Sequence, residues 1–322
     1  MYRVTASIII HSVNIARYAK LPFYGIIFFM EELFKYTFSE KNQITITGIN
    51  FSRGIIHIPE TLEDFPVTAI EPYAFAGNQE LAEVILPGTL VRVGAHAFYN
   101  CKKLGTVELH DGIRELEDGA FKNCYSLNRI IMHCHNGREG CIRNLMSDNI
   151  HEVRLDIIYD SGDKSRLTFP AFEDDYVENT PARIFQAVSY GSGGAYRQCM
   201  QVGTLDYREF DNLFERSVRE DRFEAALFNS IGRLEFPYKL FASAKERYVK
   251  FLRDNETRAA KTLIDIGDID GIRLMCGLCC FTKEGADAAS VMAAEQNKPQ
   301  ITGMLMAYRQ EHFKPQRKHY EL

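Results

Sequence analysis

A 23-residue repeat is the feature that most constrains how this chain can fold. The dipeptide Ala-Phe occurs at positions 74–75, 97–98 and 120–121, always 23 residues apart. Four further apolar columns keep the same step: Ile70, Val93 and Leu116; Leu81, Leu104 and Leu127; Val84, Val107 and Ile130; and Leu86, Leu109 and Met132. Independent columns on one period indicate a single structural unit that is built several times in succession.

A period of about 20–29 residues is typical of a leucine-rich solenoid, in which each repeat forms one coil. A single coil cannot bury its own apolar face, so successive coils stack and share one continuous core. We therefore expect Phe75, Phe98 and Phe121 to stack as an internal spine. Another column, Asn78, Cys101 and Cys124, is expected to form an internal ladder that faces backbone groups between coils. A redox or metal role for this column is the alternative.

The ends of the repeat are less regular. Ile56 lies 28 residues before Val84, so the first coil carries a five-residue insertion, which we place within residues 60–68. At the other end, Val153 lies 23 residues after Ile130, but the Ala-Phe pair is missing there. We expect this coil to be partial and to be the last one.

The segments "ITITGIN" and "IHIPETLEDFPVTAIEPYAFAGNQELAEVILPGTLVRVGAHAFYNCKKLGTVEL" resemble the BspA-type bacterial leucine-rich repeat family. The resemblance covers about residues 34–132. It implies a solenoid fold, and it implies a role as a surface adhesin or as an interaction module, with no catalytic residues and no cofactor.

The strand of each coil reads Leu-x-x-Val-x-Leu, and side chains alternate across a strand. Residues between the buried positions should therefore point outward and form a partner-binding face. The predicted residues are Glu83, Ile85, Thr106, Glu108, Arg129, Ile131, Glu152 and Arg154. Neighbouring strands lie about 4.8 Å apart, so four coils give a patch on the order of 15–20 Å across, which suits a peptide or a small protein surface. Ile85 and Ile131 are apolar where water is expected, which favours an interaction site. Alternatively, the C-terminal helices cover this sheet.

Beyond Pro181 the apolar spacing becomes helical. The segment "DAASVMAAEQNKPQITGMLMAYR" resembles an ankyrin helix pair, although the step from Ile272 to Ile301 is shorter than the ankyrin period of about 33. Plain antiparallel helices are the alternative. From "VENTPARIF" to "EHFKP" the chain also resembles a helical tail of some intracellular bacterial leucine-rich repeat proteins. The expected fold class is α+β: a leucine-rich repeat β-solenoid followed by an all-α, partly ankyrin-like helical domain.

The expected domain organisation begins with a non-repeat leader and a start-competent Met30 that follows it. The predicted segments are the leader 1–29, the repeat domain 30–160, a linker 161–180, the helical domain 181–313 and a basic tail 314–322. The leader's apolar run is shorter than the roughly 20 residues of a membrane span, and it has no small-residue cleavage site. A short helix that covers the open end of the solenoid is the competing interpretation of this leader.

Composition narrows the function. The net charge of -5 argues against nucleic-acid binding, which needs clustered Lys and Arg. The 8 cysteines of a chain this long are expected to be reduced thiols, which favours a cytoplasmic location. An atypical export signal in the leader would instead place the chain at the cell surface or outside the cell. The leading hypothesis is a scaffold that binds a protein or peptide, without stable membrane insertion.

Three motifs contain residue types that could form chemical sites. Cys276, Cys279 and Cys280 form C-x-x-C-C at the end of an apolar helix, where the helix dipole opposes a thiolate, so core packing is expected. His133, Cys134, His135 and Cys141 are zinc ligand types without a standard spacing, so an exposed turn is expected. Residues 191–194, Gly-Ser-Gly-Gly, lack the Lys of a phosphate loop. A thiol or carboxylate enzyme, built from Cys199, Cys276 or the acidic linker, is the alternative function.

Overall fold

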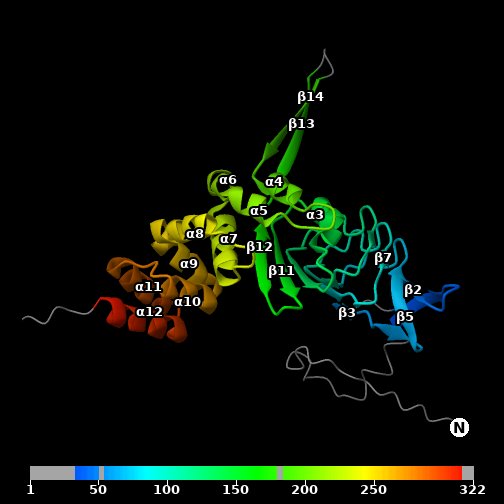
Figure 1. Cartoon of the computed structure of the whole chain (residues 1–322), viewed down its shortest axis with the longest axis horizontal. Helices are drawn as coiled ribbons and strands as arrows, with labels where there is room; N and C mark the ends of the chain where they lie inside the picture. Colours follow the sequence, from blue (N-terminus) through cyan, green and yellow to red (C-terminus); the bar gives the residue numbers. More distant parts are fainter. Residues whose placement is uncertain (1–32, 51–53, 180–183, 314–322) are drawn as a thin grey trace, which may run out of the picture.

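In the computed structural model, which describes residues 33–50, 54–179 and 184–313, the chain forms a β-solenoid followed by a series of helices (Figure 1). The α+β class predicted from the sequence is confirmed, and so is the 23-residue period, because Val84 pairs with Val107 and Val107 with Ile130. The predicted leader, Met30 and the basic tail lie outside the described residues.

Two sheets form the solenoid. One has the order β1-β2-β5-β7-β9, with β4 beside β5, and the other has the order β12-β11-β10-β8-β6-β3. The first contains β1 (Phe34–Phe38), β2 (Ile44–Ile49), β4 (Thr61–Leu62), β5 (Phe65–Ile70), β7 (Arg92–Val93) and β9 (Glu115–Leu116). The second contains β3 (Ile55–His57), β6 (Glu83–Ile85), β8 (Thr106–His110), β10 (Arg129–Cys134), β11 (Val153–Tyr159) and β12 (Lys164–Phe169).

The pairing confirms the irregular first coil and corrects the last one. Ile56 pairs with Val84, so the five-residue insertion is present, and it holds the short antiparallel pair β4–β5. Ile130, however, pairs with Leu155 and not with Val153, so the last coil is two residues longer than predicted. The helices η2 (Glu139–Ile142) and α3 (Arg143–Asp148) replace the usual turn in this coil and account for the extra length.

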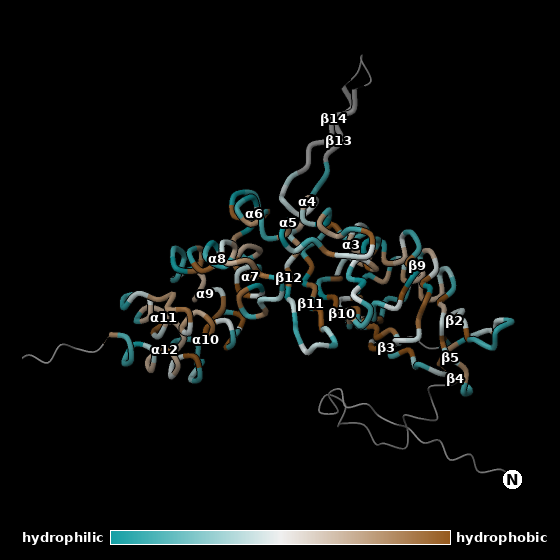
Figure 2. The backbone as a smooth tube through the Cα atoms, in the orientation of Figure 1, coloured by the Kyte–Doolittle hydropathy of each residue, from teal (hydrophilic) through white to brown (hydrophobic). Residues whose placement is uncertain are grey.

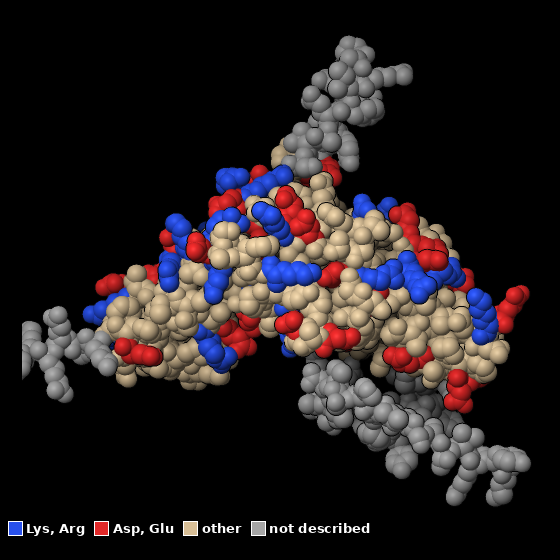
Figure 3. Space-filling model, in the orientation of Figure 1, with Lys and Arg blue, Asp and Glu red and all other residues tan. Residues whose placement is uncertain are grey.

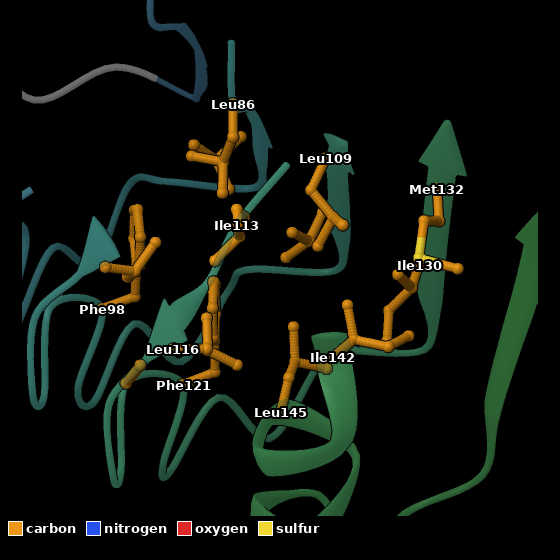
Figure 4. Close-up of a cluster of buried hydrophobic side chains, with 14 of the residues drawn as sticks. Leu86, Phe98, Leu109, Ile113, Leu116, Phe121, Ile130, Met132, Ile142 and Leu145 are labelled. Carbon is orange, nitrogen blue, oxygen red and sulfur yellow. The ribbon is translucent and has the colours of Figure 1, made fainter. Parts of the chain in front are cut away.

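The interior of the solenoid is a stack of like residues, as predicted. The ring centroids of Phe75 and Phe98 lie 4.8 Å apart with planes 7° from parallel, and those of Phe98 and Phe121 lie 4.8 Å apart at 9°. Figure 4 shows Phe98 and Phe121 in one buried cluster with Ile142 of η2. Leu109 of β8 and Ile130 of β10 belong to the same cluster. Figure 2 shows hydrophobic stretches along β10 and β11 and a more hydrophilic turn between β11 and β12.

The predicted ladder beside this spine is present for both cysteines. Cys101 donates its sulfhydryl proton to the carbonyl of Phe75 at 3.2 Å, and Cys124 donates to the carbonyl of Phe98 at 3.2 Å. Each thiol therefore satisfies a backbone acceptor of the preceding coil. Burial raises the pKa of Cys101 to about 11 and that of Cys124 to about 12, which keeps both protonated as the ladder requires.

The predicted linker, residues 161–180, is not an irregular segment. It contains β12, which pairs antiparallel with β11, and β13 (Glu173–Asn179). β13 pairs with β14 (Ile184–Tyr190), so the region predicted to be entirely helical begins with a strand, and the hairpin projects from the body (Figure 1). Strand β12 lacks the simple alternation that would reveal it, because α7 covers its outer side and residues 167–169 are all buried. The domain boundaries themselves remain a prediction.

The helical region contains α4 (Gly193–Gln198), α5 (Tyr207–Asn212), α6 (Phe214–Glu220), α7 (Phe223–Glu235), α8 (Ala242–Asp254), α9 (Glu256–Ile266), α10 (Ile269–Gly277), α11 (Lys283–Glu295) and α12 (Pro299–His312). Their ends follow from local sequence. The side chains of Asp206, Asp268 and Thr282 cap the helices that follow them, and Gly267 ends α9 in a left-handed conformation with φ of 73°.

Two apolar cores meet at the junction of the two regions. The core of the solenoid continues through Phe169 and Tyr196 to Phe210, and the core of the helices begins at Phe214. Helix α7 packs on β12, where Asn229 accepts a hydrogen bond from the backbone of Thr168 at 2.9 Å. The edge strand that ends the solenoid sheet is therefore covered by the same chain.

A search of the described residues finds no helix that combines the length and the apolar character needed to cross a membrane.

Candidate functional site

The outward side of the six-stranded sheet presents two straight rows of side chains, which we call the outer face. The strand register places one row in the order Ile55, Glu83, Thr106, Arg129, Arg154 and Thr168. It places the second row in the order His57, Ile85, Glu108, Ile131, Asp156 and Arg166. Each row crosses all six strands. The residues between the two rows point into the core, because side chains alternate along a strand.

The predicted partner-binding residues of β6, β8 and β10 all lie on this outer face and are partly exposed. They are Glu83, Ile85, Thr106, Glu108, Arg129 and Ile131. The last predicted pair is displaced: Arg154 lies beside Arg129, Asp156 takes the expected place beside Ile131, and Glu152 precedes β11. A shift of two residues keeps Arg154 outward because side chains alternate with a period of two.

Ile85 and Ile131 do not form the apolar patch that the sequence suggested. Both are half-buried, and Glu108 lies between them in the row. The outer face is therefore polar and charged, with apolar positions spaced along it. Figure 3 shows Lys, Arg, Asp and Glu interspersed on the visible surface, without a large area of one sign.

Ion pairs and a hydrogen bond hold several charged side chains of the outer face in place. Arg129 donates to Asp156 through Nη2 at 3.1 Å, and Arg166 donates to the same carboxylate through Nε at 2.7 Å. Glu108 Oε1 and His133 Nε2 lie 2.8 Å apart. The hydrogen bond with His133 holds the pKa of Glu108 below its usual value, although burial opposes this effect. These contacts fix side-chain positions before any partner arrives.

Three histidines gather at the end of the rows. The ring centroids of His110 and His133 lie 4.7 Å apart, and those of His110 and His135 lie 5.4 Å apart. His110 Nδ1 is 3.2 Å from His135 Nε2, and His135 Nδ1 contacts Asp160. Burial and the charges of His133 and His135 together lower the pKa of His110 to about 4.

The predicted candidates for zinc do not converge. His133 points outward, whereas Cys134 points into the core, where its sulfur lies 3.4 Å from Asp111 Oδ2. Cys141 lies against Met132 instead. Burial and the charge of Asp111 raise the pKa of Cys134 to about 12, which disfavours the thiolate that binds zinc. In the described part of the chain, no group of three or more His, Cys, Asp or Glu is placed to hold a metal ion.

The core packing expected for the three cysteines at the end of α10 holds for Cys280, which is buried, but not for Cys279, which is exposed. Burial raises the pKa of Cys199 to about 12 and that of Cys276 to about 11, so neither thiol is activated. The turn at residues 191–194 is filled by Asp221, which accepts a hydrogen bond from the backbone N–H of Ser192 at 2.8 Å. A carboxylate there occupies the place a bound phosphate would need.

The helices cover only one end of the outer face. Helix α7 lies against β12 (Figure 1). It places the ring of Phe228 5.5 Å from the guanidinium of Arg154. β3, β6 and β8 lie at the far end of the solenoid from the helices, and their outward side chains keep part of their exposure. The contact between Arg154 and Phe228 could not be predicted from the sequence, because it joins residues from two different regions of the chain.

The stacked coils, their parallel strands and their 23-residue period define the class: a solenoid of leucine-rich repeats. Residues 31–155 match the family model described as the BspA type leucine rich repeat region, in 6 copies. The match does not extend to α4 or the helices after it, so the resemblance of the helical region to ankyrin stays a prediction.

Solved structures of bacterial leucine-rich repeat proteins are similar to part of this chain. One from T. pallidum is 19% identical, with a TM-score of 0.24, over 34% of this chain and 76% of that one. Another, from Bacteroides capillosus ATCC 29799, is 23% identical, with a TM-score of 0.30, over 31% and 78%. A leucine rich cell surface protein from Faecalibacterium prausnitzii A2-165 is 20% identical, with a TM-score of 0.23, over 32% and 43%. The search of curated proteins gave no match.

Proposed function

We propose that this chain is a scaffold that binds a peptide or a small protein surface on the outer face of its solenoid. The observation that carries the proposal is the pair of straight rows on neighbouring strands, several of whose charged members are already held in place. Asp156 fixes two arginines and His133 fixes Glu108. Side chains that are ordered before binding lose little freedom on binding, which favours affinity.

The dimensions of the outer face support this proposal. Six strands at a spacing of about 4.8 Å give a surface on the order of 25 Å long. A standard protein interface buries about 800 Å² on each partner, which corresponds to a patch roughly 28 Å on each side. The outer face is of about this length, so it suits a peptide or a small domain. The mixed charges of both rows suit a polypeptide better than a nucleic acid, which needs an excess of positive charge.

The state of the cysteine thiols is relevant to two alternatives, a location outside the cell and a thiol enzyme. All 8 cysteines are free, which supports a reducing compartment such as the cytoplasm. The raised pKa values of Cys199 and Cys276 speak against thiol catalysis, because the thiolate is the nucleophile. We therefore propose a binding role without a catalytic step.

A display library of random peptides tests the proposal. Peptides enriched on the intact chain should bind the wild type and lose binding when Ile85→Asp and Ile131→Asp are combined on the outer face. The matched control combines Val291→Asp and Met306→Asp, which place the same change at exposed positions of α11 and α12. The proposal fails if no peptide is enriched, or if the two double variants bind the peptides equally well.

A further inference from the structure

A hollow of about 290 Å³ lies where the outer face meets the helices. It is lined by Asn128, Arg129, Glu152, Arg154, Thr168 and Phe228. Arg129, Arg154 and Thr168 are neighbours across β10, β11 and β12, and Phe228 comes from α7. The sheet thus forms one wall of the hollow and the first helix packed against it forms the other.

Three guanidinium groups gather at this place, and two of them share one carboxylate. Arg129 and Arg166 both donate to Asp156. Arg154 has no hydrogen bond or ion pair from its side chain to any residue that the structure describes, and it lies over the ring of Phe228. Arg129 and Arg154 both line the hollow, and of these two only Arg154 lacks an ion pair with a residue that the structure describes.

The environment of Arg154 disfavours its own charge. Burial and the positive charge of Arg166 lower the pKa of its guanidinium, although the charges of Asp156 and Asp268 oppose this effect. A partly desolvated cation without a partner raises the free energy of the folded state. An anion supplied by a ligand would remove this penalty, and guanidinium groups bind carboxylates through two parallel hydrogen bonds.

A second unsatisfied group lines the same hollow. Thr168 is 2% exposed, and its hydroxyl has no hydrogen-bond partner among the described residues. Its backbone N–H is already used, because it donates to Asn229. Buried hydroxyl groups without a partner are uncommon in native proteins. An acceptor atom in the hollow would satisfy this hydroxyl next to Arg154, which lies opposite Thr168 in the strand register.

Glu152 is the acidic residue in the lining. Burial raises the pKa of its carboxyl group, whereas the charges of Arg222 and Arg154 lower it. Within the described residues it forms no ion pair with Arg154. A bound anion would lie near Glu152 and be repelled by it when it is ionised. The change Glu152→Gln is therefore expected to strengthen binding of an anion. In a hollow that bound a neutral hydrogen-bonding group, the loss of this negative charge would not strengthen binding.

We propose that this hollow binds a carboxylate group of a polypeptide held on the outer face, with Arg154 as the main donor and the Thr168 hydroxyl as the second. The proposal rests on the proposed function, because the outer face supplies the rest of the contact. The carboxylate belongs either to an Asp or Glu side chain or to the C-terminus of the bound polypeptide, and the chemistry at Arg154 is the same for both.

The first experiment tests the hollow without any polypeptide. Acetate and acetamide are titrated into the intact chain while the Arg154 Nε–Hε signal is followed by NMR and assigned with Arg154→Met. Acetate should shift this signal saturably, and acetamide should not. Thr168→Val should weaken acetate binding roughly 2- to 10-fold, the effect of one lost hydrogen bond. Arg258, which lies over Phe223 at 4.0 Å, is the matched control cation, and its signal should not respond.

The second experiment tests the use of the hollow by a polypeptide. Peptides selected on the outer face are resynthesised with each Asp or Glu changed to Asn or Gln, and separately with an amidated C-terminus. One of these changes should weaken binding to the wild type by roughly 10- to 100-fold, the effect of charge-assisted hydrogen bonds. The same change should have no effect on binding to Arg154→Met, and its effect should persist in Arg258→Met. Glu152→Gln should strengthen binding of the unmodified peptide.

The outcomes separate this inference from the proposed function. The inference is overturned if acetate leaves the Arg154 signal unchanged or moves the Arg258 signal equally. It is also overturned if outer-face peptides bind equally well with and without their carboxylates, a result that leaves the proposed function intact. If acetate binds at Arg154 but no peptide is selected on the outer face, the proposed function fails, and a polypeptide is excluded as the source of the carboxylate.

Discussion

The ring of Phe98 lies parallel to the ring of Phe121, with the centroids 4.8 Å apart and 9° between the planes. The same ring contacts Phe75 on its other side at the same distance. Phe98 is therefore the middle member of the spine, whereas Phe75 has one stacked neighbour among the phenylalanines. Because stability in a solenoid depends on contacts between adjacent coils, the middle ring connects two interfaces at once.

We expect Phe98→Ala to cost about 3–5 kcal/mol of unfolding free energy, the usual loss for a buried phenylalanine. Phe75→Ala should cost about 1 kcal/mol less, because it removes one aromatic pair and not two. Urea unfolding followed by circular dichroism measures both. Equal losses for the two variants would contradict the view that stacking between the phenylalanines of adjacent coils stabilises the solenoid.

The contact between α7 and β12 depends on a glycine. A Cβ added at Gly232 would lie 2.9 Å from Arg166 O and from Arg166 Cγ. Gly232→Ala should therefore push the helix off the strand and destabilise the protein by about 1–2 kcal/mol, even though alanine favours a helix by about 1 kcal/mol. Gly303→Ala in α12 is the matched control, since an added Cβ meets nothing there within 4 Å. The control should be neutral or stabilising in the same urea unfolding measurement, and a stabilised Gly232→Ala would rule out tight packing at this contact.

Acid should destabilise the solenoid through His110. Its pKa falls from the ordinary 6.5 to about 4 on folding, chiefly because of burial. Between these values the unfolded chain binds a proton that the folded chain does not, so stability is lost as the pH falls through this window. The pKa of His57 is also lowered by burial and acts in the same direction.

The quantity to measure is the urea concentration at the midpoint of unfolding, at about pH 7 and at about pH 5. The midpoint of the wild type should fall, and the midpoint of His110→Gln should fall less, because glutamine does not titrate. A wild-type urea midpoint that is higher at the lower pH would contradict the predicted loss of stability in acid.

The structure also bears on the predicted boundary near residues 160–180. A fragment that ends at residue 160 lacks β12 and leaves β11 as an open edge, and it loses Phe169 and Phe210 from the core. We expect such a fragment to aggregate, whereas a fragment that ends at residue 212 should be soluble and unfold cooperatively. Thermal unfolding and size-exclusion chromatography distinguish the two. A well-folded fragment that ends at residue 160 would restore the boundary predicted from the sequence.

The regular part of the fold follows from the sequence because each buried column repeats a local rule. Val84, Val107 and Ile130 recur at one step, and that step sets both the strand register and the outward direction of Glu108. The prediction failed where the repeat ends. Leu155 takes the place predicted for Val153 because a helix replaces a turn, and one-dimensional spacing carries no record of such a replacement.

The junction could not be predicted for a different reason. Arg197 is 7% exposed, and its guanidinium donates hydrogen bonds to the carbonyl oxygens of Met146, Asn149, His151, Pro170 and Gly193. Backbone carbonyls are present at every position, so no motif identifies the acceptors of a buried arginine. For the same reason the sequence indicated Arg154 as an outward residue but not the hollow that surrounds it.

The antiparallel strand β12 determines where the repeat array can be lengthened. A duplicated 23-residue unit inserted between β6 and β10 would meet a parallel strand and a stacked ring on each side. The same unit inserted after β11 would meet a strand that runs in the opposite direction. Gene duplication, or a protein engineer, can therefore extend this molecule only on the amino-terminal side of β11. Each added coil would move the β1–β2 hairpin about 4.8 Å farther from the helices, while the surroundings of Arg154 would stay the same.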